Sequence, residues 1–156
     1  MGPEEMKEKA VDLFSKRFHC SQAVLTAGME KLGCVDESVV KAMGLFGGGI
    51  SSTGRVCGAL IGAVAVVSCM YSRGNLNEKE NPRMWRLGQK LTRKFEELTA
   101  SYGGVDCRDI ARVDWGDKEA AKQFYADPES RRKICLELVG EMAKVVGEMI
   151  EEETAK

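Results

Sequence analysis

The sequence has little histidine and none of the short cysteine motifs. Its 156 residues include one histidine and six cysteines, and no two cysteines have the spacing C-x-x-C. A single histidine excludes HExxH zinc peptidases and histidine-rich metal sites. The missing C-x-x-C spacing excludes thioredoxin-like pairs, zinc ribbons and ferredoxin-like cysteine runs, and the missing C-x-x-C-H excludes attached c-type haem.

An excess of charge of one sign is also absent. Lysine and arginine number 23, aspartate and glutamate number 24, and the net charge is -1. This balance gives no electrostatic basis for binding nucleic acid or anionic lipid, so we expect neither as a partner.

Long apolar runs are missing as well. The longest uncharged stretch, residues 56–72, has 17 residues, fewer than the roughly 20 that a membrane-spanning helix needs. We therefore expect a buried core helix there and no membrane span. The first residues, Met1 to Lys7, contain no apolar leader segment. We expect a cytoplasmic protein, in which thiols stay reduced.

Helical periodicity dominates the sequence, and strand-like alternation is absent. A chain of this length forms one domain. We predict an all-α, single-domain helical bundle of five to seven helices over residues 1–156, with an apolar central helix near residues 55–73. Besides the central helix, the expected helices lie near residues 3–18, 21–32, 36–43, 82–102 and 117–126, and from residue 128 onward.

The last predicted helix is amphipathic and ends in an acidic run. Its apolar stripe consists of Ile134, Leu138, Met142, Val145 and Met149. Such a face can support a homodimer or the docking of a partner helix. We expect the final run, residues 151–153, to be a solvated and frayed helix end, because negative charge there opposes the helix dipole.

Four of the six cysteines fall near predicted helix starts, namely Cys20, Cys57, Cys107 and Cys135. A helix start presents unpaired amide donors and partial positive charge. Both stabilise a thiolate, which is the reactive and metal-binding form of cysteine. These four cysteines are our candidate catalytic residues and our candidate metal ligands, and Cys57 is the one we expect to matter most.

The remaining cysteines and the histidine give weaker signals. Cys34 follows Gly33 in a turn, and Cys69 lies near the end of the apolar helix, where we interpret it as a packing residue. His19 precedes Cys20 directly. Adjacent side chains at a helix start do not usually face each other, so we expect a surface or capping role for His19 and no catalytic dyad.

A glycine-rich loop precedes Cys57. Its candidate cofactor-binding residues are Gly48, Gly49, Gly54 and Gly58. The loop lacks the Lys and Ser/Thr of a phosphate-binding loop, and no strand precedes it, so the pattern does not indicate a nucleotide site. We expect these glycines to let the backbone approach the Cys57 thiol, and we expect Gly58 and Gly62 to allow close helix contact.

Three stretches carry a family resemblance: residues 18–25 (FHCSQAVL), residues 44–62 with CGALIG at their end, and the late cysteines 107 and 135. The chain resembles a family of small proteins described as redox-active and named for the pattern C…CGAxxG…C…C. The resemblance implies that Cys20, Cys57, Cys107 and Cys135 are the four characteristic cysteines. A similar region occurs in split-Soret cytochromes, where an iron–sulfur centre is suspected.

Three functions remain open at this point. The first is thiol redox chemistry or electron transfer, with Cys20 and Cys57 as the pair that cycles between dithiol and disulfide. The second is a four-cysteine site for an iron–sulfur cluster or zinc, favoured by an all-sulfur ligand set. The third is a helical interaction module without chemistry. The cofactor stays unknown, with an iron–sulfur cluster as the candidate, and so does the redox partner.

Overall fold

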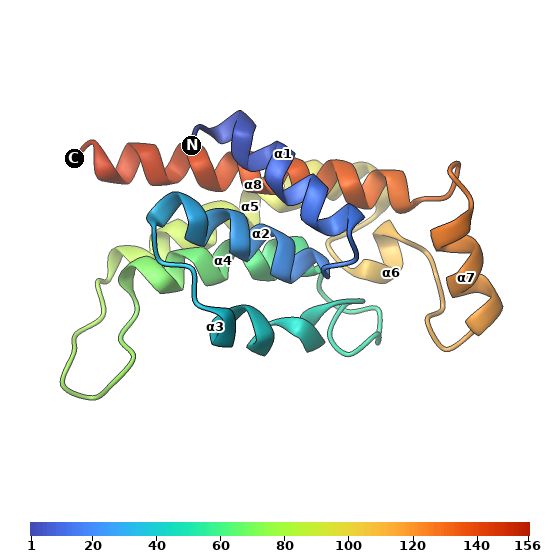
Figure 1. The fold of residues 1–156 in the computed structure, drawn as a ribbon, viewed down its shortest axis with the longest axis horizontal. Helices are drawn as coiled ribbons and strands as arrows, with labels where there is room; N and C mark the ends of the chain where they lie inside the picture. Colours follow the sequence, from blue (N-terminus) through green and yellow to red (C-terminus); the bar gives the residue numbers. More distant parts are fainter.

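The computed structural model describes residues 1–156, and its regular elements are all helices (Figure 1). The eight α-helices are α1 (Pro3–Ser15), α2 (Cys20–Leu32), α3 (Glu37–Ala42), α4 (Gly58–Tyr71), α5 (Arg83–Thr99), α6 (Cys107–Ile110), α7 (Lys118–Ala126) and α8 (Arg132–Thr154). Two 3-10 turns, η1 (Gly44–Phe46) and η2 (Ala100–Tyr102), extend the set. The all-α prediction is confirmed, but the predicted count of five to seven helices is too low.

The additional helix is α6, a single turn of four residues. Its N-cap residue Asp106 and its third residue Asp109 form a reciprocal capping box, in which the backbone N–H of Asp106 donates to the Asp109 carboxylate at 3.3 Å. Such a box satisfies two amides that a helix start leaves without partners. Local capping therefore makes a regular turn from a segment that has little apolar periodicity.

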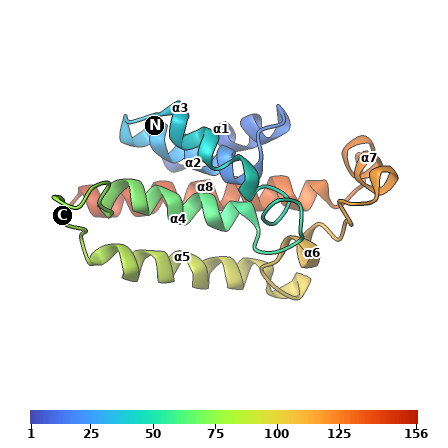
Figure 2. The same cartoon turned by 90° about the horizontal axis from the view of Figure 1, so that it is seen from below.

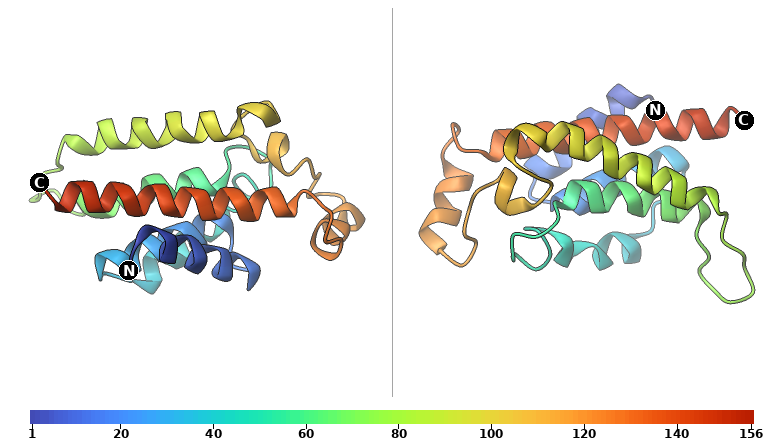
Figure 3. Two further views of the ribbon diagram at one scale, coloured as in Figure 1. Left: turned by 90° about the horizontal axis from the view of Figure 1, so that it is seen from above. Right: turned by 180° about the vertical axis from the view of Figure 1, so that it is seen from behind.

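The core lies where α1, α2, α4 and α8 pack together, and α5 covers a further side of α4 (Figure 2). Helix α8 runs the length of the bundle, with α1 on one side and α5 on the other (Figure 3). Its apolar stripe packs mainly on α1 and α2. The homodimer predicted from this stripe stays a prediction.

Helix α4 is shorter than the predicted helix at residues 55–73. Residue Val56 forms an isolated antiparallel bridge with Asp106, and Cys57 is the N-cap, so the helix begins only at Gly58. The outer side of the last turns of α4 is uncovered, because Ser68 and Cys69 are exposed. No helix of the chain combines the length and the apolar character needed to cross a membrane.

Helices α2 and α4 approach each other closely at glycines. A Cβ atom added at Gly62 would lie 2.6 Å from the carbonyl oxygen of Ser21, and one added at Gly28 would collide with the Val66 side chain. The predicted close contact at Gly58 and Gly62 is therefore confirmed. It fixes the start of α4 beside the start of α2, which positions the site described below.

The acidic end of α8 differs from its prediction. Glu153 is buried, and its side chain accepts a hydrogen bond from the Tyr71 hydroxyl at 2.8 Å and pairs with Arg83 at 3.0 Å. The prediction of a solvated end is therefore wrong for Glu153. The reason is tertiary: the ends of α4 and α5 bring a hydroxyl and a cation to this one carboxylate.

Candidate functional site

Four helix starts meet at one end of the bundle. The first residues of α2, α4, α6 and α8 lie at the end from which α7 projects (Figure 1). Cys20 is the first residue of α2, Cys57 is the N-cap of α4, Cys107 is the first residue of α6, and Cys135 is the fourth residue of α8. All four side chains line one cavity of about 80 Å³.

A short antiparallel bridge holds Cys57 next to Cys107. The backbone N–H of Cys57 donates to the carbonyl of Val105 at 3.0 Å, and the N–H of Cys107 donates to the carbonyl of Arg55 at 2.6 Å. These two hydrogen bonds tie the segment before α4 to the segment before α6. Two cysteines that lie 50 residues apart in the chain thereby reach the same cavity.

Cys20 lies directly against the start of α4. A Cβ atom added at Gly58 would be 2.7 Å from the Cys20 sulfur and 2.9 Å from the amide nitrogen of Ser21. Only glycine lets the two helix starts come this close. Gly58 thus brings the amides of both helix starts to one sulfur atom.

The glycine-rich loop contains five consecutive residues with left-handed backbone conformation, Gly48, Gly49, Ile50, Ser51 and Ser52, with φ between 53° and 71°. For the three residues other than glycine this conformation costs roughly 1–2 kcal/mol each. Hydrogen bonds across the loop hold it, including Arg55 N–H to Gly49 carbonyl at 2.8 Å. Strain of this kind persists where the surrounding structure enforces it, often at functional sites.

The predicted cofactor-binding glycines have different positions. Gly48 and Gly58 line the cavity. A Cβ atom at Gly49 would lie 2.7 Å from Cβ of Cys107, so Gly49 packs behind that cysteine. Gly54 lies against Arg108 and does not line the cavity. Their role in holding a cofactor stays a prediction.

An aromatic wall lines part of the cavity. It consists of Phe14 from α1, Trp115 from the segment before α7, and Phe124 and Tyr125 from α7. The rings of Trp115 and Phe124 meet edge to face, with centroids 5.1 Å apart. The Trp115 indole N–H donates to the Cys107 sulfur at 3.5 Å. The wall thus places apolar surface and one hydrogen-bond donor beside the thiols.

The electrostatic surroundings make Cys20 the thiol that ionises first. The pKa of Cys20 is lowered, chiefly by a hydrogen bond that the Cys57 thiol donates to it. Burial opposes this shift, but backbone N–H groups at the starts of α2 and α4 lower the pKa further. The pKa of Cys57 is raised well above its ordinary value, first because its thiol hydrogen-bonds to Cys20 and then because it is buried.

The other two cysteines of the cavity are held in the protonated form. Burial raises the pKa of Cys107, against the hydrogen bond from Trp115. Burial also raises the pKa of Cys135 to about 12, and the nearby Arg131 and Arg132 only partly offset it. The sequence favoured Cys57 as the leading residue, whereas the surroundings assign the most stable thiolate to Cys20. A hydrogen bond between two side chains leaves no signal in a single sequence.

The four sulfur donors suit a metal or cluster by chemical type, since thiolates select iron–sulfur clusters and zinc. Their spacing does not suit a single ion, because no three Cys, His, Asp or Glu side chains surround one point closely enough to hold it. We therefore derive no step through a metal. The cysteines are also free of disulfides, and all six are thiols.

The residues outside the four cysteines are placed as follows. His19 is the exposed N-cap residue of α2, and its backbone N–H donates to the Gln22 side chain at 3.2 Å, in agreement with a capping position. Cys34 is exposed in its turn. Cys69 is exposed, so its interpretation as a packing residue is wrong. The outer side of α4 has no helix over it at this position.

The aromatic wall and the arginines around it were not predicted. Arg17, Arg131 and Arg132 lie beside the aromatic side chains of this end of the bundle. Arg131 and Arg132 lie shortly before Cys135 in the sequence. This proximity was the signal from which they could have been predicted near the thiols. Arg17 and Tyr125 come together only in the fold.

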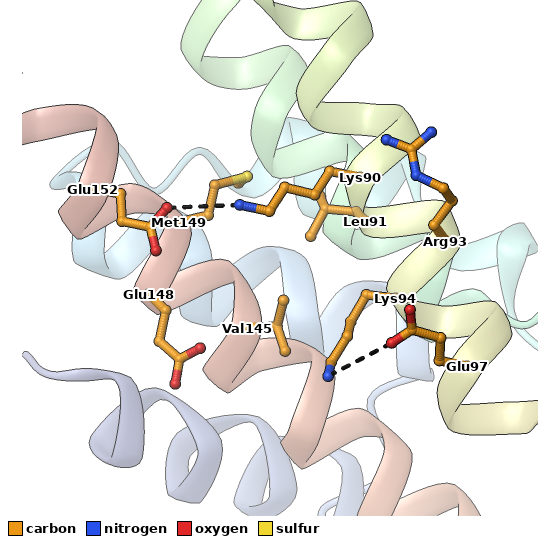
Figure 4. A pocket seen from close by; sticks show the side chains of 9 residues that line it. All are labelled: Lys90, Leu91, Arg93, Lys94, Glu97, Val145, Glu148, Met149 and Glu152. Carbon is orange, nitrogen blue, oxygen red and sulfur yellow. Dashed lines mark ion pairs between the residues drawn. The ribbon is translucent and has the colours of Figure 1, made fainter.

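A larger hollow of about 330 Å³ lies between α5 and α8, well apart from the cysteines (Figure 4). Lys90 of α5 reaches across it to pair with Glu152 of α8 at 3.7 Å, and Lys94 pairs within α5 with Glu97 at 4.0 Å. The hollow is lined by three cations and three carboxylates and contains no thiol. Four of these six charged side chains form two ion pairs with one another.

The chain matches the model of a known protein family. A family model described as "Putative redox-active protein (C_GCAxxG_C_C)" matches residues 18–149. The chain belongs to this family. The C_GCAxxG_C_C match includes all four helix starts that border the cavity. The resemblance inferred from the cysteine pattern is thus confirmed.

The chain is also similar to an archaeal protein along most of its length. The chain is 29% identical over 151 residues to an "Uncharacterized protein" of Archaeoglobus fulgidus, and the alignment covers 91% of each chain. No solved structure matches the chain.

Proposed function

We propose that this protein carries out dithiol–disulfide exchange, with Cys20 as the attacking thiolate and Cys57 as the resolving thiol. The observation that carries the proposal is the contact at the Cys20 sulfur. This sulfur lies against Gly58, the first residue of α4, and shares its cavity with Cys57. The Cys57 thiol and the amides of two helix starts lower the pKa of Cys20. A thiolate stabilised in this way attacks disulfides at a pH where ordinary cysteine is mostly protonated.

The donor relationship also explains how the second step follows the first. While Cys20 is a thiolate, the Cys57 proton lies in the hydrogen bond between the two sulfurs. Once Cys20 forms a mixed disulfide, that negative charge is gone, and with it the interaction that raises the pKa of Cys57. Cys57 then loses its proton more easily and attacks Cys20. The pair ends as a disulfide, and two electrons have passed to the substrate.

Thiol counting tests this proposal. We expect protein purified under reducing conditions to lose two thiols on mild oxidation and to regain them on reduction. The count is best made with Cys34→Ser and Cys69→Ser in place, because these exposed thiols lie outside the cavity and react independently. An identical count in oxidised and reduced samples contradicts the proposal.

A second candidate is a four-cysteine site for an iron–sulfur cluster or zinc. It is supported by the four thiols that border one cavity and by the loop amides of residues 48–50, which donate no hydrogen bond within the chain. A bound cluster would supply one-electron chemistry. An absorption spectrum with iron, sulfide and zinc analysis of anaerobically purified protein tests it. Bound iron and sulfide would replace the dithiol proposal, and metal-free protein would remove this candidate.

A further inference from the structure

Three arginines without carboxylate partners lie next to residues of the thiol cavity, although none of them lines it. Arg17 and Arg132 lie over rings of the aromatic wall, and Arg131 contacts the cavity residue Ile110. Arg17, Arg131 and Arg132 form none of the eleven ion pairs of the chain. The acidic residues beside them in the sequence are occupied elsewhere. Asp12 pairs with Lys16 at 2.9 Å, and Glu129 pairs with Lys133 at 3.0 Å. None of the three guanidinium groups therefore has a carboxylate within 4.0 Å.

Arg132 has a buried donor that nothing in the chain accepts. Its guanidinium lies 5.4 Å from the ring centre of Phe14 and 5.3 Å from that of Tyr125, and both rings line the cavity. One of its terminal nitrogens donates to the Phe14 carbonyl at 3.4 Å, but its Nε is buried and has no hydrogen-bond partner. A buried donor without a partner is uncommon and costly in folded proteins.

Arg131, the neighbour of Arg132 in the sequence, also has a buried donor without a partner. Its Nε donates to the carbonyl of Ile110, a cavity residue, at 2.7 Å, and its Nη2 is buried without a partner. Of the three buried side-chain polar atoms in the chain that lack a partner, two therefore belong to these adjacent arginines. Their unused donors are concentrated beside the thiols.

Arg17 adds an exposed cation at the same wall. Its guanidinium lies 4.0 Å from the ring centre of Tyr125, so this ring contacts two arginines, Arg17 and Arg132. The backbone of Arg17 is left-handed, with φ of 83°, just after the end of α1. Glycine is the usual residue at such a position. For arginine the left-handed backbone is energetically unfavourable, and it places the side chain over Tyr125.

We propose that Arg17, Arg131 and Arg132 bind the carboxylates of a small anionic disulfide and so select the substrate that exchanges with Cys20. This inference rests on the proposed dithiol function and adds a substrate class to it. Planar guanidinium groups recognise carboxylates through paired hydrogen bonds. The rings of Phe14 and Tyr125, beside Arg132, offer apolar surface to the rest of such a molecule.

The reaction that follows is balanced without any further reagent. The Cys20 thiolate attacks one sulfur of the substrate R–S–S–R, a Cys20–S–S–R bond forms, and R–S⁻ leaves. Cys57 gives up its proton and attacks the Cys20 sulfur, which releases the second R–S⁻. Two protein thiols are oxidised to one disulfide, and the substrate disulfide is reduced to two thiols.

The test uses three disulfides of similar size and different charge with the full chain carrying Cys34→Ser and Cys69→Ser. They are 3,3′-dithiodipropionate, which is a dianion, bis(2-hydroxyethyl) disulfide, which is neutral, and cystamine, which is a dication. The rate of Cys20 oxidation is measured at neutral pH and low salt. Each rate is divided by the rate of the same disulfide with a free cysteine peptide.

We expect the dianion to have the highest normalised rate. Arg17→Gln and Arg132→Gln should each lower the dianion rate about fivefold or more and leave the neutral rate within about twofold, whereas Arg17→Lys should retain most of the preference. Arg86→Gln, on the exposed side of α5 and without an ion pair, is the matched control. Arg17 is exposed, so its variants remain informative if the Arg132 variant folds poorly.

Two results overturn the inference and differ from failure of the proposed function. If the rates for all three disulfides fall together in the arginine variants, the arginines act on Cys20 reactivity or on structure and do not select substrate. If the dianion shows no preference in the unaltered arginine background, the site does not recognise carboxylates. If no disulfide oxidises Cys20 at all, the dithiol proposal itself fails, and the substrate inference fails with it.

Discussion

The hydrogen bond from Cys57 to Cys20 makes a sharp prediction about the reactivity of Cys20. The Cys57→Ala substitution removes the donor that lowers the pKa of Cys20 most. A hydrogen bond to a charged group contributes about 1.5–3 kcal/mol, and each 1.4 kcal/mol corresponds to about tenfold in an equilibrium. At a pH below the Cys20 pKa, we therefore expect the thiolate fraction to fall about tenfold or more.

The Cys57→Ser substitution is the matched control. A serine hydroxyl can still donate to the Cys20 sulfur, although it cannot form a disulfide. Both variants abolish the resolving step, so any difference between them reports the donor alone. We expect Cys57→Ser to keep a Cys20 pKa near that of the parent protein and Cys57→Ala to raise it.

The assay is the rate of Cys20 alkylation as a function of pH, followed by mass spectrometry of the peptide that contains Cys20. Cys34→Ser and Cys69→Ser remove the exposed thiols that would react in parallel. The sign follows from the lowered pKa: the reactive thiolate is present above the shifted pKa and is lost as pH falls through it. Identical profiles for the alanine and serine variants would refute the reasoning.

Three further predictions concern stability and use urea unfolding as the measurement. Gly62→Ala should lower the free energy of unfolding by about 1–3 kcal/mol because the added methyl group meets a carbonyl of α2. Gly88→Ala is the control: this glycine of α5 faces open space, so the change should raise the free energy of unfolding by up to about 1 kcal/mol. Equal effects of the two changes would rule out the tight α2–α4 contact. Glu153→Ala should lower the free energy of unfolding by about 1–3 kcal/mol because the Tyr71 hydroxyl loses its acceptor. Glu152→Ala, which removes an exposed ion pair, should lower it by less than about 1 kcal/mol. The reverse order would contradict the burial of the helix end. The pKa of the Cys135 thiol is about 12 in the folded protein and about 8.5 in the unfolded chain. Above about pH 8.5 the free energy of unfolding should therefore fall by up to about 1.4 kcal/mol per pH unit. Cys135→Val should flatten this slope, and an unchanged slope would show that Cys135 does not contribute.

Local sequence signals accounted for the helices and for the placing of cysteines at their starts. Gly33 ends α2 in the left-handed conformation, and Asp36 and Asp117 cap the helices that follow them. Such signals act within a few residues, so they can be read without a fold. The same holds for Gly58 and Gly62, whose spacing of four places both on one helix face.

The features that could not be predicted from the sequence depend on residues that are far apart along the chain. Glu153 looked like part of a solvated acidic run because Tyr71 and Arg83 reach it only in the folded chain. The left-handed run through Ile50 contains a β-branched residue in a conformation that its side chain disfavours, so local propensity predicts something else there. The aromatic wall likewise requires α1 and α7 to meet at the cavity.

The central claim is that Cys20 and Cys57 form the exchanging pair, and a disulfide map tests it most directly. Metal-free protein is oxidised with one equivalent of a small disulfide and unfolded in denaturant, the remaining thiols are alkylated with a maleimide at mildly acidic pH, and the peptides are identified by mass spectrometry. The account predicts one linked peptide pair, Cys20 with Cys57, and alkylated Cys107 and Cys135. Alkylated Cys20 and Cys57, or a bond from either to a different cysteine, would contradict it.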